Sequence, residues 1–412
     1  MMRKRVPVAE LKVGMFVDEL CASWMEHPFW RSRFPIRNED VLRRIIESGI
    51  REAWIDTELG ADIEPPAPAI SVEEAEAEVD QRLGRASRDA SVRRKDHTSL
   101  AEELCEARAI LHRAKPALVS MFTEARMGRA IDTGAVDALV DEISASVSRN
   151  ASALISLSRL RDADDYTYMH SAAVCAMMIA LARQAGADER SVRDAGLAGM
   201  MHDLGKARVP LEILNKPGAL TDSEFAQMKA HPRFGHDMLV ALGGIDHPVL
   251  DACLHHHEKI DGTGYPDGLA GDGISLIARM AAVCDVYDAI TSNRPYKTGW
   301  SPAESIRRMA EWQKGHFDPN VFRAFVKTVG IYPIGSIVRL ACTRLAVVVD
   351  IGARPLLRPL VKAFYSTHHK TQIEPEAIDL AAPGCTNKIV GIEDDQDWGL
   401  AHTDDIWAGV QR

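Results

Sequence analysis

Histidines are concentrated in one part of this 412-residue sequence. Eight of the 15 histidines lie between His170 and His257, and three of them are consecutive at positions 255–257. His202 and Asp203 are adjacent and end an apolar run in the segment AGMMHDLGK. A single His-Asp pair is typical of an ordinary helix end, but composition does not explain a histidine triple close to it. Side chains of these types bind divalent metal ions through nitrogen and oxygen.

Seven side chains are candidate metal ligands in this stretch. They are His170, His202, Asp203, His231, His256, His257 and Asp285. Most lie in segments with helical periodicity, and helices can direct ligands toward one point inside a bundle. The segment ARMAAVCDVYDAITS is apolar around Asp285, where a buried carboxylate is costly unless a cation compensates it. Donor sets without thiolate suit iron, manganese, nickel, cobalt or catalytic zinc rather than structural zinc.

The size of this ligand set predicts two metal ions rather than one. Seven ligands exceed what one such ion usually takes from a protein, so two ions that share one carboxylate fit better. Two neighbouring ions suit in-line displacement at phosphorus, with a bridging hydroxide as the nucleophile. We therefore expect a binuclear metallo-phosphohydrolase.

The elements that would position these residues are mainly helical. Residues 1–63 are expected to form a small α+β domain, and residues 64–98, which are rich in proline and charge, a linker. Residues 99–162 are expected to be a helical connector and residues 163–330 the helical catalytic domain. Short β-branched runs between glycines and prolines predict a β-rich extension over residues 331–412.

An apolar stripe runs along the expected connector. It is formed by Val136, Leu139, Val140, Ile143 and Val147, at spacings of three and four residues. Core packing and a homodimer seam both explain this stripe better than a cofactor does.

Composition narrows the class of protein. The chain is 46% hydrophobic and 26% charged with a net charge of −10, which predicts a globular protein that does not coat nucleic acid. A small anionic ligand is still compatible, because a local cluster can override the global sign. The seven cysteines are scattered without a Cys-x-x-Cys motif, and no apolar segment is long enough to span a membrane. We expect a cytoplasmic protein.

Three motifs resemble those of the HD-GYP family of cyclic di-GMP phosphodiesterases. They are HDLGK at 202–206, HHEKIDGTGYP at 256–266 and DVYDAITSNRPYK at 285–297. The similarity runs from about residue 165 to about residue 330, and RVPVAELKVGMFV with HPFW near the N-terminus resembles the small domain of unknown function that often precedes such cores. The resemblance implies an all-helical HD-type core that hydrolyses cyclic di-GMP to linear pGpG, with further hydrolysis to GMP left open.

The resemblance also implies how the ligands are divided. One ion would be held by His170, His202, Asp203 and Asp285, and the other by Asp203, His231, His256 and His257, with Asp203 as the bridge. Some HD-GYP cores hold a third ion through a glutamate four residues before the first histidine. Tyr166 stands there, and a phenol with a pKa near 10 is a poor ligand. We expect two divalent transition-metal ions, iron or manganese first, with zinc, nickel or cobalt as alternatives.

Four further residues match substrate-binding positions of the family. Lys206 matches a lysine near the scissile phosphate, where it could stabilise developing charge and act as a catalytic residue with Asp203. Arg294 and Lys297 match residues that grip phosphates or guanines. Tyr265 lies in the Gly-Tyr-Pro turn, from which it can stack or donate a hydrogen bond.

Other polar residues near the motifs are expected outside the ligand set: His236, His247, His255, Glu258, Asp288 and Cys284. For Asp288, a contact with a ligand or substrate and a plain helix surface are equally supported. Glu258 is expected to support a ligand rather than to act as a base, and Cys284 to lie in the core.

Two alternatives to the phosphodiesterase remain. One is an HD-type hydrolase for nucleotides or another cyclic dinucleotide, which the GYP motif and the Arg294 and Lys297 pair disfavour. The other is a cyclic di-GMP receptor with little turnover, which the intact ligand set disfavours. The expected partners are cyclic di-GMP, a second copy through the helical connector, and a signalling protein at the N-terminal domain or GYP motif.

Overall fold

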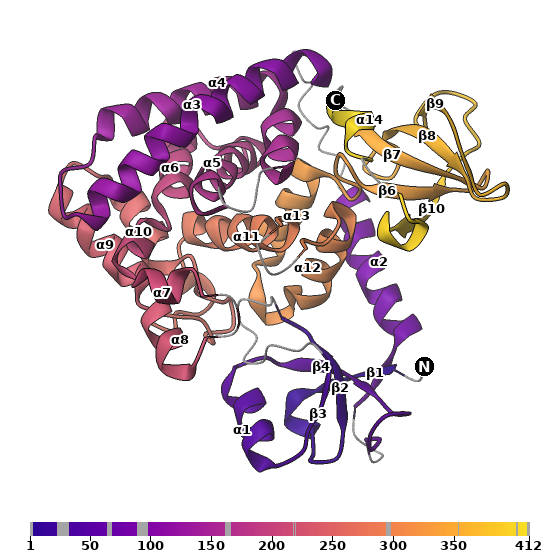
Figure 1. The fold of residues 1–412 in the computed structure, drawn as a ribbon, viewed down its shortest axis with the longest axis horizontal. Helices are drawn as coiled ribbons and strands as arrows, with labels where there is room; N and C mark the ends of the chain where they lie inside the picture. The colour runs from indigo at the N-terminus through magenta and orange to yellow at the C-terminus, as the bar shows by residue number, and fades with distance from the viewer. Residues whose placement is uncertain are drawn as a thin grey trace.

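The computed structural model describes residues 3–22, 33–63, 68–88, 98–160, 166–216, 218, 220–293, 298–352, 354–400 and 403–409. Helices form the central part of the structure. One five-stranded sheet is built from the N-terminal residues that precede them, and another from the C-terminal residues that follow them (Figure 1). This confirms the mainly helical fold class with an α+β N-terminal domain and a β-rich C-terminal extension. Within these ranges, none of the helices has the length and apolar character that crossing a membrane requires.

The N-terminal sheet has the strand order β3-β2-β4-β1-β5 with antiparallel pairs. Its strands are β1 (Arg3–Pro7), β2 (Phe16–Leu20), β3 (Phe34–Pro35), β4 (Glu52–Asp56) and β5 (Ile70–Ser71). Helix α1 (Glu39–Glu47) begins where the Asn38 side chain accepts a hydrogen bond from the Val41 amide at 3.0 Å. Val17, Ile45 and Ile55 are fully buried and join α1 to the sheet in one small core.

The range 64–98 is more than the linker that we expected. It contains strand β5 and helix α2 (Val72–Arg88), which packs on α12 (Pro302–His316) and α13 (Pro319–Val329). Ala75, Val79 and Leu83 are buried, whereas the acidic residues between them are mostly exposed. The helix therefore has an apolar stripe. The composition of the segment does not reveal this stripe, because acidic residues surround it.

The helices expected as a connector belong to the central bundle. Helices α3 (Leu100–Arg126) and α4 (Thr133–Leu157) pack on each other and on α5 (Tyr166–Gln184), and they share one hydrophobic core with α6 (Glu189–Met201). The stripe from Val136 to Val147 is buried inside this core. Core packing therefore explains the stripe, and the reason to expect a homodimer seam there is gone.

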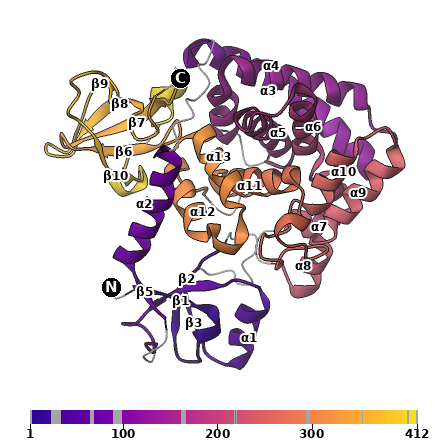
Figure 2. The same ribbon diagram turned by 180° about the vertical axis from the view of Figure 1, so that it is seen from behind.

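The rest of the bundle surrounds one central helix. The remaining helices are α7 (Leu211–Leu214), α8 (Asp222–Met228), α9 (His231–Leu242), α10 (His247–His255) and α11 (Leu276–Thr291), followed by α12 and α13. Figure 2 shows α11 in the middle, between the α5 side and α12. Nearly every residue of α11 after its first turn is buried, as expected for a helix that is apolar on all sides.

The C-terminal sheet has the order β10-β6-β7-β8-β9 and is antiparallel throughout. Its strands are β6 (Ile337–Leu340), β7 (Arg344–Asp350), β8 (Leu360–Ser366), β9 (Thr371–Asp379) and β10 (Ile389–Glu393), followed by the short helix α14 (Asp405–Ala408). The buried run of β7 joins the core of the bundle.

Candidate metal centre

His202 and Asp203 directly follow α6, and two glycines beside them allow close helix packing. A Cβ on Gly199 would come within 2.8 Å of the Cys175 backbone in α5, and one on Gly205 within 1.9 Å of the His231 carbonyl. Only glycine fits such distances. Both close approaches bring the end of α6 against α5 and against the start of α9. No local pattern in the sequence indicates this role of the two glycines, although Gly205 lies within the HDLGK motif.

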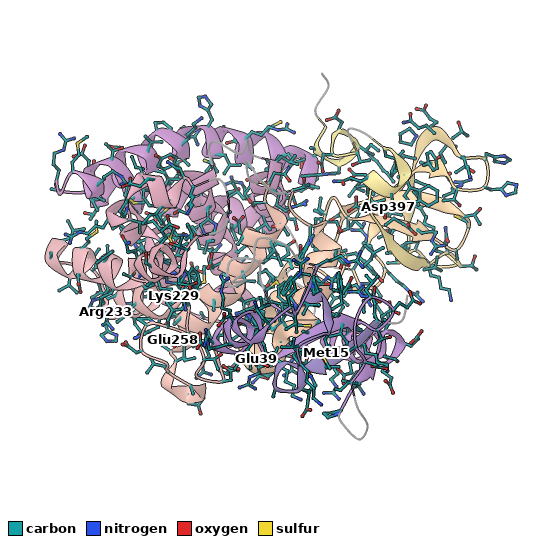
Figure 3. All side chains as sticks on the ribbon, turned by 60° about the horizontal axis from the view of Figure 1, so that its bottom comes forward. Met15, Glu39, Lys229, Arg233, Glu258 and Asp397 are labelled. Atoms are coloured by element: carbon teal, nitrogen blue, oxygen red, sulfur yellow. The ribbon has the colours of Figure 1, made fainter. Side chains whose placement is uncertain are left out.

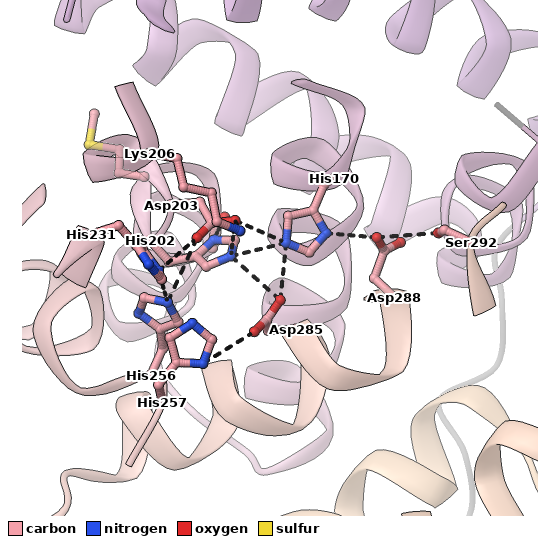
Figure 4. Close-up of polar contacts among 12 residues, drawn as sticks. His170, His202, Asp203, Lys206, His231, His256, His257, Asp285, Asp288 and Ser292 are labelled. Carbon is pink, nitrogen blue, oxygen red and sulfur yellow. Dashed lines mark hydrogen bonds and ion pairs between the residues drawn. The ribbon is translucent and has the colours of Figure 1, made fainter. Parts of the chain in front are cut away.

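The seven expected ligand residues lie in one cluster at the centre of the bundle (Figure 4). His170 comes from α5, His202 and Asp203 from the end of α6, His231 from the first turn of α9, His256 and His257 from the end of α10, and Asp285 from α11. The cluster contains two groups whose ligand atoms lie within 4.8 Å of one another. The first group is His170, His202 and Asp285, and the second is Asp203, His231, His256 and His257.

In the first group, two imidazole nitrogens face each other. His170 Nε2 lies 3.2 Å from His202 Nε2 and 3.1 Å from Asp285 Oδ1. His170 Nδ1 bonds Asp288 Oδ2 at 2.7 Å, and His202 Nδ1 bonds the Gly199 carbonyl at 2.9 Å. Since these oxygens accept, each Nδ1 carries the proton of a neutral imidazole and each Nε2 has a lone pair. A cation would satisfy the lone pairs that converge there.

The second group repeats this arrangement. His231 Nδ1 donates to the Met228 carbonyl at 2.8 Å and His256 Nδ1 to the Cys253 carbonyl at 2.9 Å. Their Nε2 atoms therefore face each other as lone pairs, 3.3 Å apart. His257 is oriented differently, with Nδ1 3.9 Å from Asp285 Oδ2 and its ring stacked on Tyr265 at 4.7 Å.

Asp203 lies between the two groups and presents one oxygen to each. Its Oδ2 is 3.4 Å from His170 Nε2, and its Oδ1 is 3.2 Å from His231 Nε2. Within the described part of the chain, Oδ1 is buried and has no hydrogen-bond partner. A buried carboxylate oxygen without a partner is costly. These residues fit a pair of cations on either side of Asp203.

Electrostatics keeps these groups in their metal-binding protonation states. Burial alone would raise the pKa of Asp203, but the Lys206 ammonium beside it outweighs burial and holds that pKa well below its usual range. Burial, followed by repulsion from His202 and His231, lowers the pKa of His256 to about 3. Burial also lowers the pKa of His257. Carboxylate anions and neutral imidazoles are the forms that bind metal ions.

Two of the expected substrate residues are described at the edge of the cluster. Lys206 Nζ lies 2.5 Å from Asp203 Oδ2, and its side chain is 18% exposed. Tyr265 stacks on His257, as described above, and Lys229 Nζ lies 5.2 Å from the centre of the Tyr265 ring. Arg294 and Lys297 lie outside the described residues, and so does the side chain of Tyr166.

The other polar residues near the motifs lie outside the two groups. His236 contacts Asp237 and His247 is exposed, while His255 lies between Asp251 at 2.8 Å and Asp267 at 3.1 Å. Asp288 is buried behind His170 rather than on a helix surface, and Cys284 is in the core. Glu258 does not support a ligand side chain as we expected. Its carboxylate accepts from the amides of Asp267 at 2.7 Å and Leu269 at 3.1 Å and so supports the loop.

Comparisons with known proteins identify the family of the chain. Residues 3–136 match a domain of unknown function, DUF3391, and residues 137–321 match the HD domain. The chain is 53% identical over all of its 412 residues to cyclic di-GMP phosphodiesterase PA4108 of Pseudomonas aeruginosa, and the match covers 97% of that protein. The chain belongs to the HD-GYP family. The boundary between the two matched regions falls inside α4.

Other relatives match a smaller part of the chain. The response regulator RpfG of Xanthomonas campestris, named a cyclic di-GMP phosphodiesterase, is 40% identical over 36% of this chain and 39% of its own length. The 3'3'-cGAMP-specific phosphodiesterase 1 of Vibrio cholerae is 36% identical over 39% of this chain and 38% of its own length. Relatives that are named for two different cyclic dinucleotides are therefore each similar to less than half of this chain.

Proposed function

We propose that this protein is a cyclic di-GMP phosphodiesterase with two divalent metal ions at Asp203. The observation that carries the proposal is the Asp203 carboxylate, with one oxygen turned to each of two groups of imidazole lone pairs. The full-length relative with 53% identity carries the name cyclic di-GMP phosphodiesterase. The product that we propose is linear pGpG.

Seven residues would hold the ions, divided into His170, His202, Asp203 and Asp285 on one side and Asp203, His231, His256 and His257 on the other. When bound, such ions supply an activated nucleophile and neutralise charge at phosphorus, and iron or manganese suits these donors. Asp288 and the backbone carbonyls orient the imidazoles through their Nδ1 protons.

The substrate would be held beside this centre by four residues. Lys206 would leave Asp203 for the phosphate once cations neutralise the carboxylate. Tyr265 offers a ring face next to His257 for a guanine, and Arg294 and Lys297 would bind phosphate or guanine. We propose the reducing cytoplasm as the location, because all seven cysteines are unpaired.

The test combines metal content and product analysis on one purified sample. We expect two transition-metal ions per chain and conversion of cyclic di-GMP to pGpG, faster than hydrolysis of 3'3'-cGAMP. Asp203→Ala should abolish turnover and lower the occupancy of both ions, whereas Asp237→Ala, a surface control on α9, should change neither. One ion per chain, or an active Asp203→Ala protein, would contradict the mechanism. Tight binding of cyclic di-GMP without hydrolysis would favour the receptor alternative.

A further inference from the structure

The N-terminal domain touches the loop that follows the histidine pair. This loop, residues 258–271, is called the GYP loop below. Arg51 lies between α1 and β4, and its Nε is 2.7 Å from Asp261 Oδ2 in the GYP loop. At Gly49 in the same turn, a Cβ would lie within 3.8 Å of the Thr263 Cβ. Figure 3 shows Glu258, from this loop, on the side of the helical part where the N-terminal domain lies.

Asp261 is held in a tight cradle rather than on an open surface. Its Oδ1 accepts from the Thr263 amide at 2.9 Å and the Thr263 hydroxyl at 2.6 Å. Its amide donates to the Gly315 carbonyl at 3.1 Å, where α12 kinks and Gly315 has φ of +88°. A Cβ on Gly315 would come within 2.6 Å of Asp261 Oδ2. The Asp261 side chain is only 9% exposed, and Arg51 forms an ion pair with its Oδ2 atom.

The same loop reaches the metal centre four residues later. The Tyr265 amide donates to the His257 carbonyl at 3.2 Å, and the two rings stack with an angle of 25° between their planes. Gly264 packs so tightly that a Cβ there would come within 2.4 Å of the Lys259 amide nitrogen. Glu258 holds the far side of the loop through two amides. Because only three residues separate Asp261 from Tyr265, the position of Asp261 constrains the position of Tyr265.

We propose that Arg51 is a positioning residue of the phosphodiesterase. Through its ion pair with Asp261, it fixes the GYP loop so that Tyr265 stays stacked on His257, ready for the substrate. This gives the N-terminal domain a direct part in the activity of the helical domain. The inference rests on the proposed function, because Tyr265 is taken to bind the substrate.

Loss of the ion pair between Arg51 and Asp261 should weaken substrate binding and leave the stability of the protein unchanged. The Arg51 side chain is 53% exposed, and ion pairs of such side chains contribute little to global stability. Arg51→Ala should therefore leave Tm unchanged and raise KM about 3- to 10-fold, with kcat within about 2-fold of wild type. Arg51→Lys keeps a charge that can reach Asp261, and it should restore most of the affinity.

The experiment uses full-length proteins with a matched control. Arg307→Ala removes another arginine–aspartate pair, 2.7 Å from Arg307 to Asp80 between α12 and α2, away from the GYP loop. Two readouts are combined: steady-state kinetics with cyclic di-GMP, and hydrogen exchange of the backbone amides of residues 258–271. Arg51→Ala should accelerate this exchange, and Arg307→Ala should not. In a Tyr265→Ala background, Arg51→Ala should have no further effect on KM.

The outcomes separate this inference from the proposed function. Unchanged exchange and unchanged KM in Arg51→Ala would overturn it, and so would effects of Arg51→Ala and Tyr265→Ala on KM that simply multiply. A wild-type protein that does not hydrolyse cyclic di-GMP would refute the proposed function. In that case, exchange still decides whether Arg51 holds the loop: acceleration confined to Arg51→Ala supports the contact, and equal exchange in all variants refutes it.

Discussion

At the scale of single residues, the metal centre lowers the pKa values of its imidazoles and of its bridging carboxylate. Burial lowers the pKa of His202 and, with repulsion from neighbouring histidines, lowers the pKa of His256 to about 3. Protons therefore do not compete with metal ions for these groups at neutral pH.

This arrangement predicts how the metal-free protein responds to acid. His256 has a folded pKa of about 3 against an ordinary value of 6.5, so the unfolded chain binds its proton first. The stability that the neutral imidazole contributes is present above about 6.5 and is lost as pH falls toward about 3. Urea midpoints in the presence of a chelator should fall across this window. The fall should be smaller in His256→Gln and unchanged in His236→Gln, and a pH-independent midpoint in the parent protein would contradict the expectation.

Replacing Lys206 should lower the rate of catalysis without removing the metal ions. Its ammonium contacts Asp203 but belongs to neither group of ligand atoms, so Lys206→Ala should keep the metal content. Loss of one donor to the transition state should lower kcat by about 10²–10³. Lys216→Ala, which removes a 2.6 Å pair with Glu224 outside the cluster, is the matched control. Wild-type kinetics in Lys206→Ala would reduce this residue to a local counter-charge of Asp203.

At the scale of elements, the centre is built mostly at helix ends. The ends of α6 and α10 and the start of α9 supply His202, Asp203, His256, His257 and His231, while α5 and α11 supply residues from within a helix. Backbone carbonyls in the last turns are free to accept, and they orient the imidazoles there. The elements thus provide both the ligands and the groups that fix their direction.

The tight packing of the GYP loop can be tested by a substitution at Gly264. In Gly264→Ala, the added methyl group would meet the backbone of Lys259 at 2.4 Å and of Glu258 at 2.5 Å, so the loop must shift. Such overpacking costs about 1–3 kcal/mol, and the shift should displace Tyr265 and raise KM. Gly273→Ala is the control, because a Cβ there has no atom within 4 Å. Kinetic measurements on both variants check this, and equal KM values would argue against a tight loop.

At the scale of the whole molecule, a buried carboxylate joins the N-terminal domain to the bundle. Trp54 Nε1 of β4 donates to Glu311 Oε1 of α12 at 2.7 Å, and Arg5 Nη1 lies 3.6 Å from the same oxygen. Arg308 Nη1 lies 3.7 Å from the other oxygen and 2.8 Å from Glu19 of β2. These contacts fix the orientation of the N-terminal domain on α12, next to the kink that holds Asp261.

Removing the Glu311 carboxylate should weaken the interface between the N-terminal domain and the helical bundle. Glu311→Ala leaves the buried Trp54 indole without its acceptor and Arg5, 2% exposed, with one anion fewer. A buried donor left without a partner costs about 1–3 kcal/mol. We expect the urea midpoint of Glu311→Ala to fall, and that of Glu304→Ala, whose carboxylate is 37% exposed on the same helix, to change little. Equal midpoints would mean that the interface does not depend on Glu311.

The residue types of the candidate centre and the class of the fold could be predicted from local patterns in the sequence. Histidine and aspartate at 202 and 203, the histidines at 256 and 257, and Asp285 in an apolar helix predicted a cluster, because ligand chemistry and helical period are local properties. Only the tertiary structure decided that Asp203 turns one oxygen to each group, that Glu258 supports a loop, and that residues 72–88 form a packed helix. It also brought Arg51 to Asp261, 210 positions apart. Such contacts depend on how distant elements pack, and no local pattern encodes the packing.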